Sequence, residues 1–522
     1  MKRFSRLYII GFLWTSLSLS AQENILTSRV LREPVQKVSE VNDANSVTTI
    51  EYYDTAGRLI QTIRKGFGPN GEDLADYIQF DEAGRIAKEY LSTPFTGNNG
   101  VFVPVSEFEQ STQTWSRTHL YEASTEGRIV ETSGMHVGGK SIKYDYRLSN
   151  SSEPELSALE FRMQNNTTIN KRMAARGAYQ VVEEIDEDGH RILLFTDSDG
   201  HTVLKRRVDG DVYHDTYMVY DAYDHLRCVL PPAAVDAYSS FDDQSLSAGN
   251  FLDLYAYFYI YDNDNQCVGV KYPGADWIYT VYDGDYRPIL SQDGNQRKRD
   301  EWSFIKYDGL GRVVIEGIVK DKRTRDDLAD IYEDVLVHEE YIGTEGPCRG
   351  YTDHIKMGQN RYILTCIRYY DNYAFTEFSS DWSFANMASS ASAKGLLTGV
   401  FEAVLNQPDK GRFTINQYDD KSRLIRRDSK ETLSNNTLSA DYSYNFSGAL
   451  IRSDSRYGNR YSLRLDYNYD HAGREKNSIC VLGYGTTHYT SPLRAFTYDS
   501  HGRISEKMMQ GNKVKMTYGY HN

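Results

Sequence analysis

Cysteine and proline are scarce in this sequence, and long apolar runs are confined to its start. The chain of 522 residues holds five cysteines and 12 prolines. The cysteines are odd in number, widely spaced and never arranged as CxxC, which argues against a disulfide framework. We expect core or strand positions for them, with one bridge as the alternative in an oxidising compartment. They are Cys228, Cys267, Cys348, Cys366 and Cys480.

An excess of positive charge is also absent. The formal net charge is −14, and removal of the three basic residues Lys2, Arg3 and Arg6 with a leader would make it −17. An acidic surface repels phosphate backbones, so the composition argues against nucleic acid as a partner.

The first 21 residues have the pattern of a secretory signal. A basic start precedes the apolar residues 7–20, and small residues precede a cleavage position after Ala21. The apolar run is too short and too close to the N-terminus for a good membrane span, and no other stretch is long and apolar enough. The sequence predicts an exported protein that begins near Gln22 and is periplasmic, at the cell surface or extracellular.

Tyrosine is abundant, with 42 residues, and part of it belongs to a recurring motif. The motif is Tyr or Phe, then Asp, with Arg five residues after the aromatic, as in "YDTAGR" and "YDGLGR". Weaker copies begin at Tyr220, Tyr261 and Tyr444. Neighbouring copies are 21 to 29 residues apart within three runs, at 53–80, 261–307 and 418–498. The predicted turn residues of the seven clear copies are Tyr53, Asp54, Gly57, Arg58, Phe80, Asp81, Gly84, Arg85, Tyr282, Asp283, Arg287, Tyr307, Asp308, Gly311, Arg312, Tyr418, Asp419, Arg423, Tyr469, Asp470, Gly473, Arg474, Tyr498, Asp499, Gly502 and Arg503.

Each position of the motif has a role in a β-turn. Asp at the first turn position can accept hydrogen bonds from backbone N–H groups ahead of it. Gly three residues later can take a positive φ, which returns the chain into an antiparallel strand. The aromatic ring and the Arg of one copy then flank the turn on opposite strands, where we expect them to stack for about 0.5–1 kcal/mol. Because the flanks alternate or carry β-branched residues, we predict a mainly β fold of serial antiparallel hairpins in one continuous curved sheet, with short helical insertions.

The motif resembles the YD repeat of bacterial RHS proteins. Long stretches at 196–232 and 271–317, with "KGLLTGVFEAVL" at 394–405, are similar to the exported branch of that family, and the similarity covers most of the mature chain. The resemblance implies an RHS-type β-shell that can enclose a C-terminal toxin domain.

Toxin-type members of that family continue into an RHS core, a self-cleavage segment and a variable C-terminal domain, none of which is visible here. The sequence ends within a repeat, at "KVKMTYGYHN". We therefore expect the N-terminal part of a longer family member or a shortened relative. Its last strand would be a sheet edge with an unpaired row of backbone groups. A dimer partner, or a separately encoded RHS continuation or toxin domain, could cover that edge.

Five regions follow from the distribution of these patterns. Residues 321–335 carry apolar side chains at helical spacing, which predicts a helical insertion between repeats. The regions are a signal peptide at 1–21, first hairpins at 22–146, a repeat sheet at 147–320, an insertion-containing region at 321–409 and final repeats at 410–522.

Several short motifs resemble sites for catalysis, cofactors or metals, but the sequence around each of them argues against such a site. "GMHVGGKS" at 134–141 matches a phosphate loop, but a strand-like segment follows it where a helix is required. "DEDG", "DSDG" and "DNDN" (186–189, 197–200 and 262–265) resemble calcium loops, but calcium needs six or more oxygens, and hairpin turns explain them better. HExxH, GxSxG and Cys–His signatures are absent. We predict no catalytic, cofactor or metal residues.

Two functions fit this architecture. The first is a non-enzymatic scaffold, part of a shell that encapsulates or presents a toxin or other cargo in interbacterial competition. The second is a cell-surface module that binds carbohydrate, or adheres, through a Tyr-rich sheet face. An enzyme such as a glycosidase would need two carboxylates held across a cleft, which a sequence alone cannot place.

Overall fold

The structure of the protein is a computed structural model. It describes residues 24–134, 140–164, 168–239, 245–247, 252–336, 338–354, 362–377, 382–383, 393–509, 511 and 513–520. The predicted signal peptide and the centre of the Gly-rich loop at 134–141 lie outside these residues. None of the described helices is long and apolar enough to cross a membrane.

The chain divides into two compact units that do not follow the linear order of the sequence. One unit combines the N-terminal segment up to Lys143 with residues 438–522, and the other comprises residues 144–437. The sequence patterns gave no sign that the two ends of the chain would pack together.

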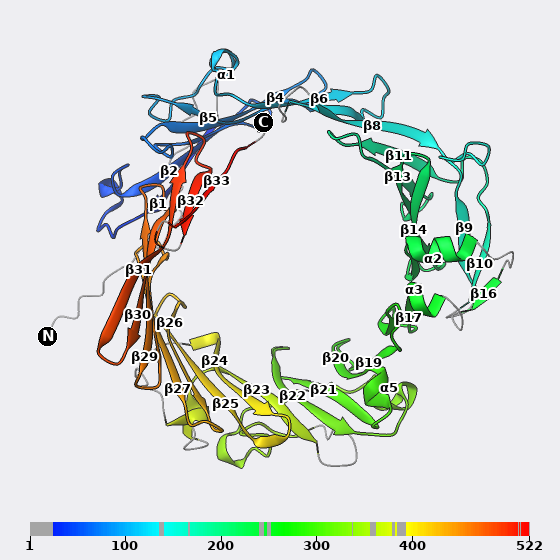
Figure 1. The fold of residues 1–522 in the computed structure, drawn as a ribbon, viewed down its shortest axis with the longest axis vertical. Coiled ribbons are helices and arrows are strands. Elements are labelled where there is room, and N and C mark those ends of the chain that lie inside the picture. Colours follow the sequence, from blue (N-terminus) through cyan, green and yellow to red (C-terminus); the bar gives the residue numbers. More distant parts are fainter. Residues whose placement is uncertain are drawn as a thin grey trace. The chain divides into compact units, whose positions relative to one another are not determined.

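The first unit is built from the N-terminal and C-terminal strands, coloured blue and red in Figure 1. In the described residues, a 3-10 helix, η1 (Val38–Glu40), and a short α-helix, α1 (Val105–Gln110), interrupt them. The strands are β1 (Asn24–Leu31), β2 (Ser46–Tyr53), β3 (Leu59–Arg64), β4 (Asp73–Phe80), β5 (Ile86–Phe95), β6 (Ser116–Tyr121), β7 (Ile129–Ser133), the start of β8 (Ser141–Leu148), β27 (Thr437–Tyr444), β28 (Leu450–Tyr457), β29 (Tyr461–Tyr469), β30 (Glu475–Tyr484), β31 (Thr487–Tyr498), β32 (Ile504–Met509) and β33 (Val514–Thr517).

The second unit holds the remaining strands and most of the helices. The strands are β9 (Leu159–Met163), β10 (Thr168–Met173), β11 (Gln180–Ile185), β12 (Arg191–Thr196), β13 (Thr202–Asp209), β14 (Val212–Tyr220), β15 (Leu226–Leu230), β16 (Ser245–Ser247), β17 (Tyr257–Tyr261), β18 (Cys267–Lys271), β19 (Ile278–Tyr282), β20 (Pro288–Gln292), β21 (Glu301–Tyr307), β22 (Val313–Lys320), β23 (Ile363–Asp371), β24 (Ala393–Val404), β25 (Gln407–Tyr418) and β26 (Leu424–Glu431). The α-helices are α2 (Pro232–Ser239), α3 (Leu252–Tyr255), α4 (Gly294–Arg297) and α5 (Arg325–Tyr332), and the 3-10 helices are η2 (Gly343–Glu345) and η3 (Ala374–Glu377).

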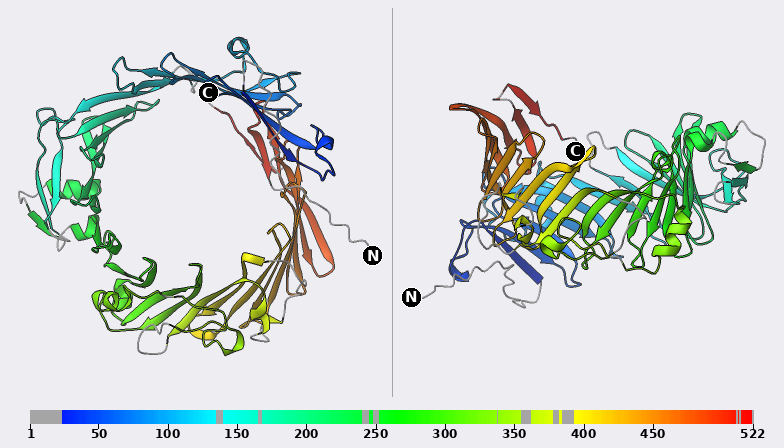
Figure 2. Two further views of the ribbon diagram at one scale, coloured as in Figure 1. Left: turned by 180° about the vertical axis from the view of Figure 1, so that it is seen from behind. Right: turned by 90° about the horizontal axis from the view of Figure 1, so that it is seen from below.

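Successive strands pair as antiparallel hairpins, which confirms the predicted fold class. Strand β2 pairs with β3, β21 with β22, and β29 with β30, each around one of the predicted turns. Of the strands in the described residues, thirty belong to one antiparallel sheet, while β9, β10 and β16 form a small separate sheet. Two further views show strands β21–β26 running side by side (Figure 2).

Buried and less buried side chains alternate along the strands, so one face of a hairpin packs in a core. In β14, Asp215, Tyr217 and Val219 are buried while the residues between them are not, as the two-residue period of a strand requires. The core of the β19–β25 region is rich in aromatic side chains. Its largest fully buried members are Trp302, Phe304, Phe375, Trp382, Phe401 and Phe413.

The predicted helical insertion at 321–335 is present as α5. It begins after Thr324, whose side chain accepts a hydrogen bond from the backbone N–H of Asp327. Leu328 and Tyr332 are buried, but Ile331 is 42% exposed, so one residue of the predicted apolar stripe faces solvent.

All five cysteines are free. Cys228, Cys348 and Cys366 are buried, and only Cys348 of the five lies outside a strand. Core and strand positions therefore explain them, and the alternative of a disulfide bridge is wrong.

Candidate functional site

The repeated turn has the same internal geometry at each clear copy, illustrated by residues 54–58. The carboxylate Oδ1 of Asp54 accepts hydrogen bonds from the backbone N–H of Ala56 and of Arg58, both at 2.9 Å. The N–H of Gly57 donates to the carbonyl of Asp54 at 3.0 Å, and Gly57 has a φ of +77°. This is a tight turn followed by a left-handed residue, and the ladder shifts register at Tyr53 as the strands resume.

The left-handed position after the turn is filled in two ways. Where the motif contains Gly, φ lies between +76° and +81°, at Gly57, Gly84, Gly311, Gly473 and Gly502. Where Gly is missing, a residue with a side chain adopts the same conformation, and the two cases are Tyr286 (φ +58°) and Ser422 (φ +61°). The turn therefore imposes positive φ whether or not glycine is present.

This conformation predicts opposite effects of two substitutions. Gly311→Val should destabilise its hairpin by about 1–2 kcal/mol, because a β-branched residue is strained at φ +76°. No atom lies within 4 Å of the added Cβ, so the cost is backbone strain alone. Ser422→Gly should stabilise its hairpin by up to about 1 kcal/mol, because the same strain is relieved. Native-state hydrogen exchange of the two hairpins measures both, and equal signs would contradict the turn geometry.

The Asp and Arg of each copy form an ion pair that the sequence patterns did not predict. In all seven copies the Arg Nε donates to the Oδ2 of the Asp four residues earlier, at 2.7–2.9 Å. Hydrogen bonds from the backbone N–H of Arg58 and of Arg85 hold the pKa of Asp54 and Asp81 below their usual value. The Asp carboxylate thus accepts hydrogen bonds from the turn backbone through Oδ1 and from the Arg side chain through Oδ2.

The predicted stacking of Tyr and Arg within one copy is wrong. In six of the seven copies the guanidinium lies instead over the aromatic ring of the next repeat, with 4.1–4.9 Å between the guanidinium carbon and the ring centroid. The pairs are Arg58–Phe80, Arg85–Tyr121, Arg287–Tyr307, Arg312–Tyr370, Arg474–Tyr498 and Arg503–Tyr520.

Two contacts explain why the ring and the guanidinium of one copy separate. The ion pair with Asp283 directs Arg287 along the row of turns, toward the following hairpin. The ring of Tyr307 lies back over the preceding hairpin, where its hydroxyl donates to the carbonyl oxygen of Pro288 at 2.8 Å. Equivalent hydroxyl bonds join Tyr121 to Ile86, Tyr370 to Val313, Tyr498 to Glu475 and Tyr520 to Ile504. A cation–π contact therefore connects each of these six pairs of neighbouring repeats, and a hydroxyl hydrogen bond accompanies it in five, because Phe80 has no hydroxyl.

Degenerate copies keep this connection with other residues. His201 and His225 replace the Arg, and their rings stack on Tyr220 and Tyr261, with 4.4 Å between ring centroids in both pairs. In a longer turn, Glu122 replaces the Asp and pairs with Arg128 at 2.7 Å. A search for an aromatic followed by any acid and then a basic residue would have found the copy that begins at Tyr121, but not the copy with His201, where Thr196 stands at the aromatic position.

One copy contains a long insertion between its Asp and its Gly. Asp371 accepts a hydrogen bond from the backbone N–H of Gly395 at 2.6 Å and also pairs with Arg312 of the previous repeat at 2.7 Å. The hydrogen bond to Asp371 raises the pKa of Arg312. The turn therefore tolerates the inserted segment without loss of its contact to the preceding repeat.

Two C-terminal turns also contact the N-terminal hairpins within the first unit. Arg474 lies over Phe67 at 5.1 Å as well as over the next repeat, and the ring of His471 is 3.0 Å from the carbonyl oxygen of Gly68. In the following turn, His501 stacks on Trp115 at 4.2 Å and lies 2.8 Å from the carbonyl oxygen of Gln113.

The same tryptophan also covers Arg503, whose guanidinium carbon is 4.0 Å from its ring. Trp115→Ala should loosen the C-terminal hairpins by about 1–2 kcal/mol, because it removes one ring stack and one cation–π contact. Faster hydrogen exchange in β31 and β32 is the expected result. Tyr223→Ala is the control, since Tyr223 is 79% exposed and lies in the other unit. Unchanged exchange in the Trp115 variant would show that this packing contributes nothing.

The acidic turns place few metal ligands together. Ligand atoms of Asp197, Asp199 and His201 all lie within 4.8 Å of one another. Both carboxylates belong to the turn already described, since the Oδ1 of Asp197 accepts from the backbone N–H of Asp199 and of His201. Three side-chain ligands fall short of the six or more oxygens that calcium requires.

A buried ionic cluster lies beside the β21–β22 hairpin. The Nζ of Lys306 is fully buried and lies 2.7 Å from Glu339 Oε1 and 2.6 Å from Asp353 Oδ1. Glu339 also accepts from the hydroxyl of Thr352 at 2.6 Å, and Asp353 from the hydroxyl of Tyr362 at 2.8 Å. The cluster fastens the irregular segment 338–354 to the sheet, a role that no sequence pattern indicated.

The protonation of this cluster follows from its contacts. Burial alone would lower the pKa of Lys306, but the hydrogen bonds to Asp353 and Glu339 outweigh it and raise the pKa above its usual value. Lys306 is therefore charged at neutral pH and balances one of the two carboxylates. The arrangement joins strand to insertion, whereas a glycosidase would need its carboxylates across an open cleft.

A family model described as a domain of unknown function, DUF6443, matches residues 27–147. A search of curated protein sequences found no match. Solved structures of complexes of TcdB2 with TccC3 are similar in fold. The complex without its hypervariable C-terminal region has a TM-score of 0.60 at 12% identity, over 95% of this chain and 21% of that chain. The complex with Cdc42 has 0.59 at 13%, and the TcdB2-TccC3 complex itself 0.58 at 12%, with the same coverage. The chain thus spans about a fifth of the length of these solved chains.

Proposed function

We propose that this protein is a non-enzymatic scaffold of the RHS type, a stretch of wall that encapsulates or presents a toxin or other protein cargo. The observation that carries the proposal is the connection between successive repeats. Each connecting Arg is held by its own Asp and lies over the ring of the next hairpin, as Arg287 does with Asp283 and Tyr307. A contact that recurs at six of the seven clear turns suits a wall, whereas an active site is normally single.

Fold similarity supports the same function. The solved structures of similar fold are TcdB2-TccC3 complexes, and one of them was determined without a hypervariable C-terminal region. The similarity extends over 95% of this chain. A protein cargo attached to or enclosed by such a wall is therefore the partner we infer.

A protease-protection experiment tests enclosure. A protease-sensitive reporter domain fused after Asn522 should be cleaved about tenfold more slowly than the free reporter, because cleavage follows the population of accessible chain. The matched control carries Arg287→Met and Arg312→Met, which remove two connections between repeats and should restore rapid cleavage. Equal cleavage of the fused and free reporters would contradict enclosure.

Export is a second element of the proposal. The basic start and apolar run at 7–20 support cleavage after Ala21. Mass spectrometry of the protein from the cell envelope or medium should find an N-terminus at or near Gln22. An intact Met1 in that material would contradict export by a cleaved signal.

A further inference from the structure

The ends of the C-terminal hairpins carry a broad apolar face that lies outside the repeat turns. Two rows of side chains cross strands β27–β31 on one side of the sheet, and cross-strand pairing places Tyr461 opposite Tyr484 and Leu463 opposite Leu482. The seven large members are 37–67% exposed. We call them the Tyr/Leu face, and they are Leu438, Tyr457, Tyr461, Leu463, Leu482, Tyr484 and Tyr489.

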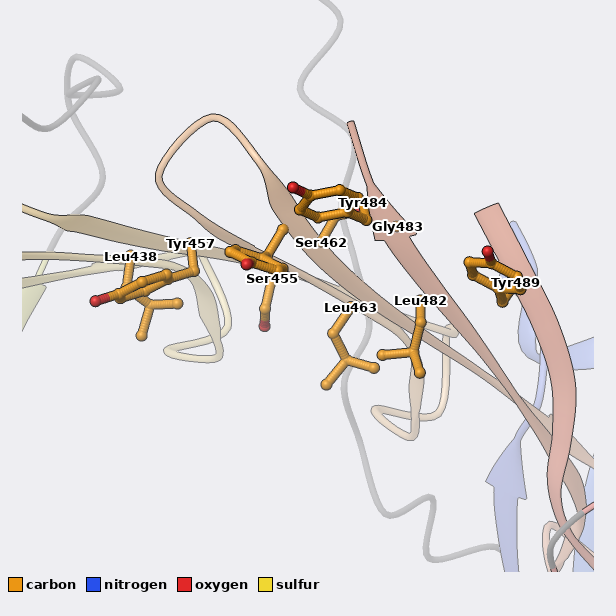
Figure 3. A pocket seen from close by; sticks show the side chains of 10 residues that line it. Leu438, Ser455, Tyr457, Ser462, Leu463, Leu482, Gly483, Tyr484 and Tyr489 are labelled. Carbon is orange, nitrogen blue, oxygen red and sulfur yellow. The ribbon is translucent and has the colours of Figure 1, made fainter. Parts of the chain in front are cut away.

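The close-up of this face shows rings and leucines along a shallow groove of about 410 Å³ (Figure 3). The rings of Tyr461 and Tyr484 are 5.2 Å apart and tilted by 45°. Sugar rings bind on flat aromatic rings surrounded by hydrogen-bonding groups, whereas here tilted rings alternate with leucines. The face therefore fits an apolar protein surface better than a carbohydrate.

Charged side chains lie on the opposite side of the same strands. Arg452 pairs with Asp466 at 2.6 Å, and Arg464 pairs with the same Asp466 at 3.0 Å. Because successive residues of a strand point to opposite faces, this charge lies away from the Tyr/Leu face. Removing the Tyr/Leu face from water therefore needs no buried charge.

The size of the face matches one side of a protein interface. A fully buried aromatic side chain removes about 150–250 Å² from water, so seven side chains that are about half exposed offer roughly 700 Å². A standard interface buries about 800 Å² per partner, and exposed apolar patches of this size mark interaction sites.

We propose that a second copy of this chain covers the Tyr/Leu face in a two-fold symmetric dimer. A two-fold contact requires a surface that complements itself. One row of the face is mostly tyrosine (Tyr457, Tyr461, Tyr484) and the other contains Leu463 and Leu482. A half-turn places the ring row of one copy on the leucine row of the other, and two sheet faces pack in this way about 10 Å apart.

The dependence of dimerisation on ionic strength distinguishes an apolar contact from one that is held by ion pairs. Two copies of a chain with a net charge of −14 repel each other, and salt screens that repulsion. Raising the salt concentration should therefore strengthen the dimer, whereas an interface held by ion pairs would weaken.

Sedimentation velocity of the purified chain across a concentration series is the test. The mass should rise from that of the 59.8 kDa monomer to twice that value, with a dissociation constant in the micromolar range or tighter. Leu482→Glu should weaken the dimer at least about 100-fold, because it buries a charge in the contact. Tyr489→Glu, at a position that is 67% exposed, is a second variant with less risk to folding.

The matched control is Leu405→Glu, which alters a leucine that is 62% exposed outside the Tyr/Leu face and should leave the dimer unchanged. A wild-type chain that stays monomeric at high concentration and high salt would overturn the proposal. A dimer that survives both Leu482→Glu and Tyr489→Glu would overturn it as well, because the association would then use another surface.

Discussion

Replacing Lys306 by methionine should destabilise the second unit by about 3–5 kcal/mol, because it leaves a buried carboxylate without its cation. The ammonium of Lys306 is fully buried and is the only group at hydrogen-bond distance to both Glu339 and Asp353 in the described residues. Thermal unfolding and hydrogen exchange in 338–354 measure the effect.

The ion cluster around Lys306 also makes stability depend on pH, and the sign of that dependence is defined. Since the pKa of Lys306 is raised in the folded state, its contribution is complete below the unfolded value of about 10.4 and is lost only as pH rises through the folded value.

The control for this prediction removes the carboxylate as well. Lys306→Met combined with Glu339→Gln should recover much of the lost stability, because no unpaired charge then remains on Glu339. Lys205→Met, which alters an exposed lysine, should have no effect beyond about 0.5 kcal/mol. A Lys306 single variant as stable as the Lys205 variant would show that the cluster does not fasten the insertion.

Arg206→Met should have an effect of similar size in another part of the same unit. Arg206 is buried and pairs with Asp215 through two hydrogen bonds of 2.8 and 2.7 Å. Its Nη1 also donates to three backbone carbonyls, those of Pro154, Glu155 and Ser157. The substitution leaves one buried carboxylate and these carbonyls unpaired, so we expect a loss of about 3–5 kcal/mol.

The adjacent residue gives the control. Arg207 points to the other face of β13 and is not buried, so Arg207→Met should change stability by no more than about 0.5 kcal/mol. The urea unfolding midpoints of the two variants, followed by a signal from the second unit, give the comparison. Equal midpoints for Arg206→Met and Arg207→Met would contradict the assignment of Arg206 as the fastener of residues 154–157.

Local features were predictable because they depend on neighbouring residues. The Asp and Gly of the motif determine the turn, and alternation determines the strands, so both follow from a short window of sequence. The helix at α5 followed from the spacing of Leu328 and Tyr332. The direction of the Arg was not predictable in this way. It depends on an ion pair within the turn and on a ring that a separate hairpin supplies.

Contacts between distant residues were also beyond the sequence patterns. His501 and Gln113 are 388 positions apart, and neither belongs to a pattern that indicates its partner. Nothing in the sequence distinguishes Lys306 from other lysines in strands, because its carboxylate partners lie 33 and 47 positions later in an irregular segment. The copies with His201 and Glu122 were overlooked or undervalued because the motif was defined by Asp and Arg alone.

A double-mutant cycle tests the connection between repeats most directly. One cycle combines Arg287→Met with Tyr307→Leu, across two hairpins, and the other combines Arg287→Met with Tyr282→Leu, within one hairpin. Hydrogen exchange of β19–β22 reports the stability of each variant. We expect a coupling of about 1 kcal/mol for Arg287 with Tyr307, and none within error for Arg287 with Tyr282. Coupling confined to Arg287 and Tyr282 would contradict it, since the repeats would then be independent hairpins instead of a connected wall.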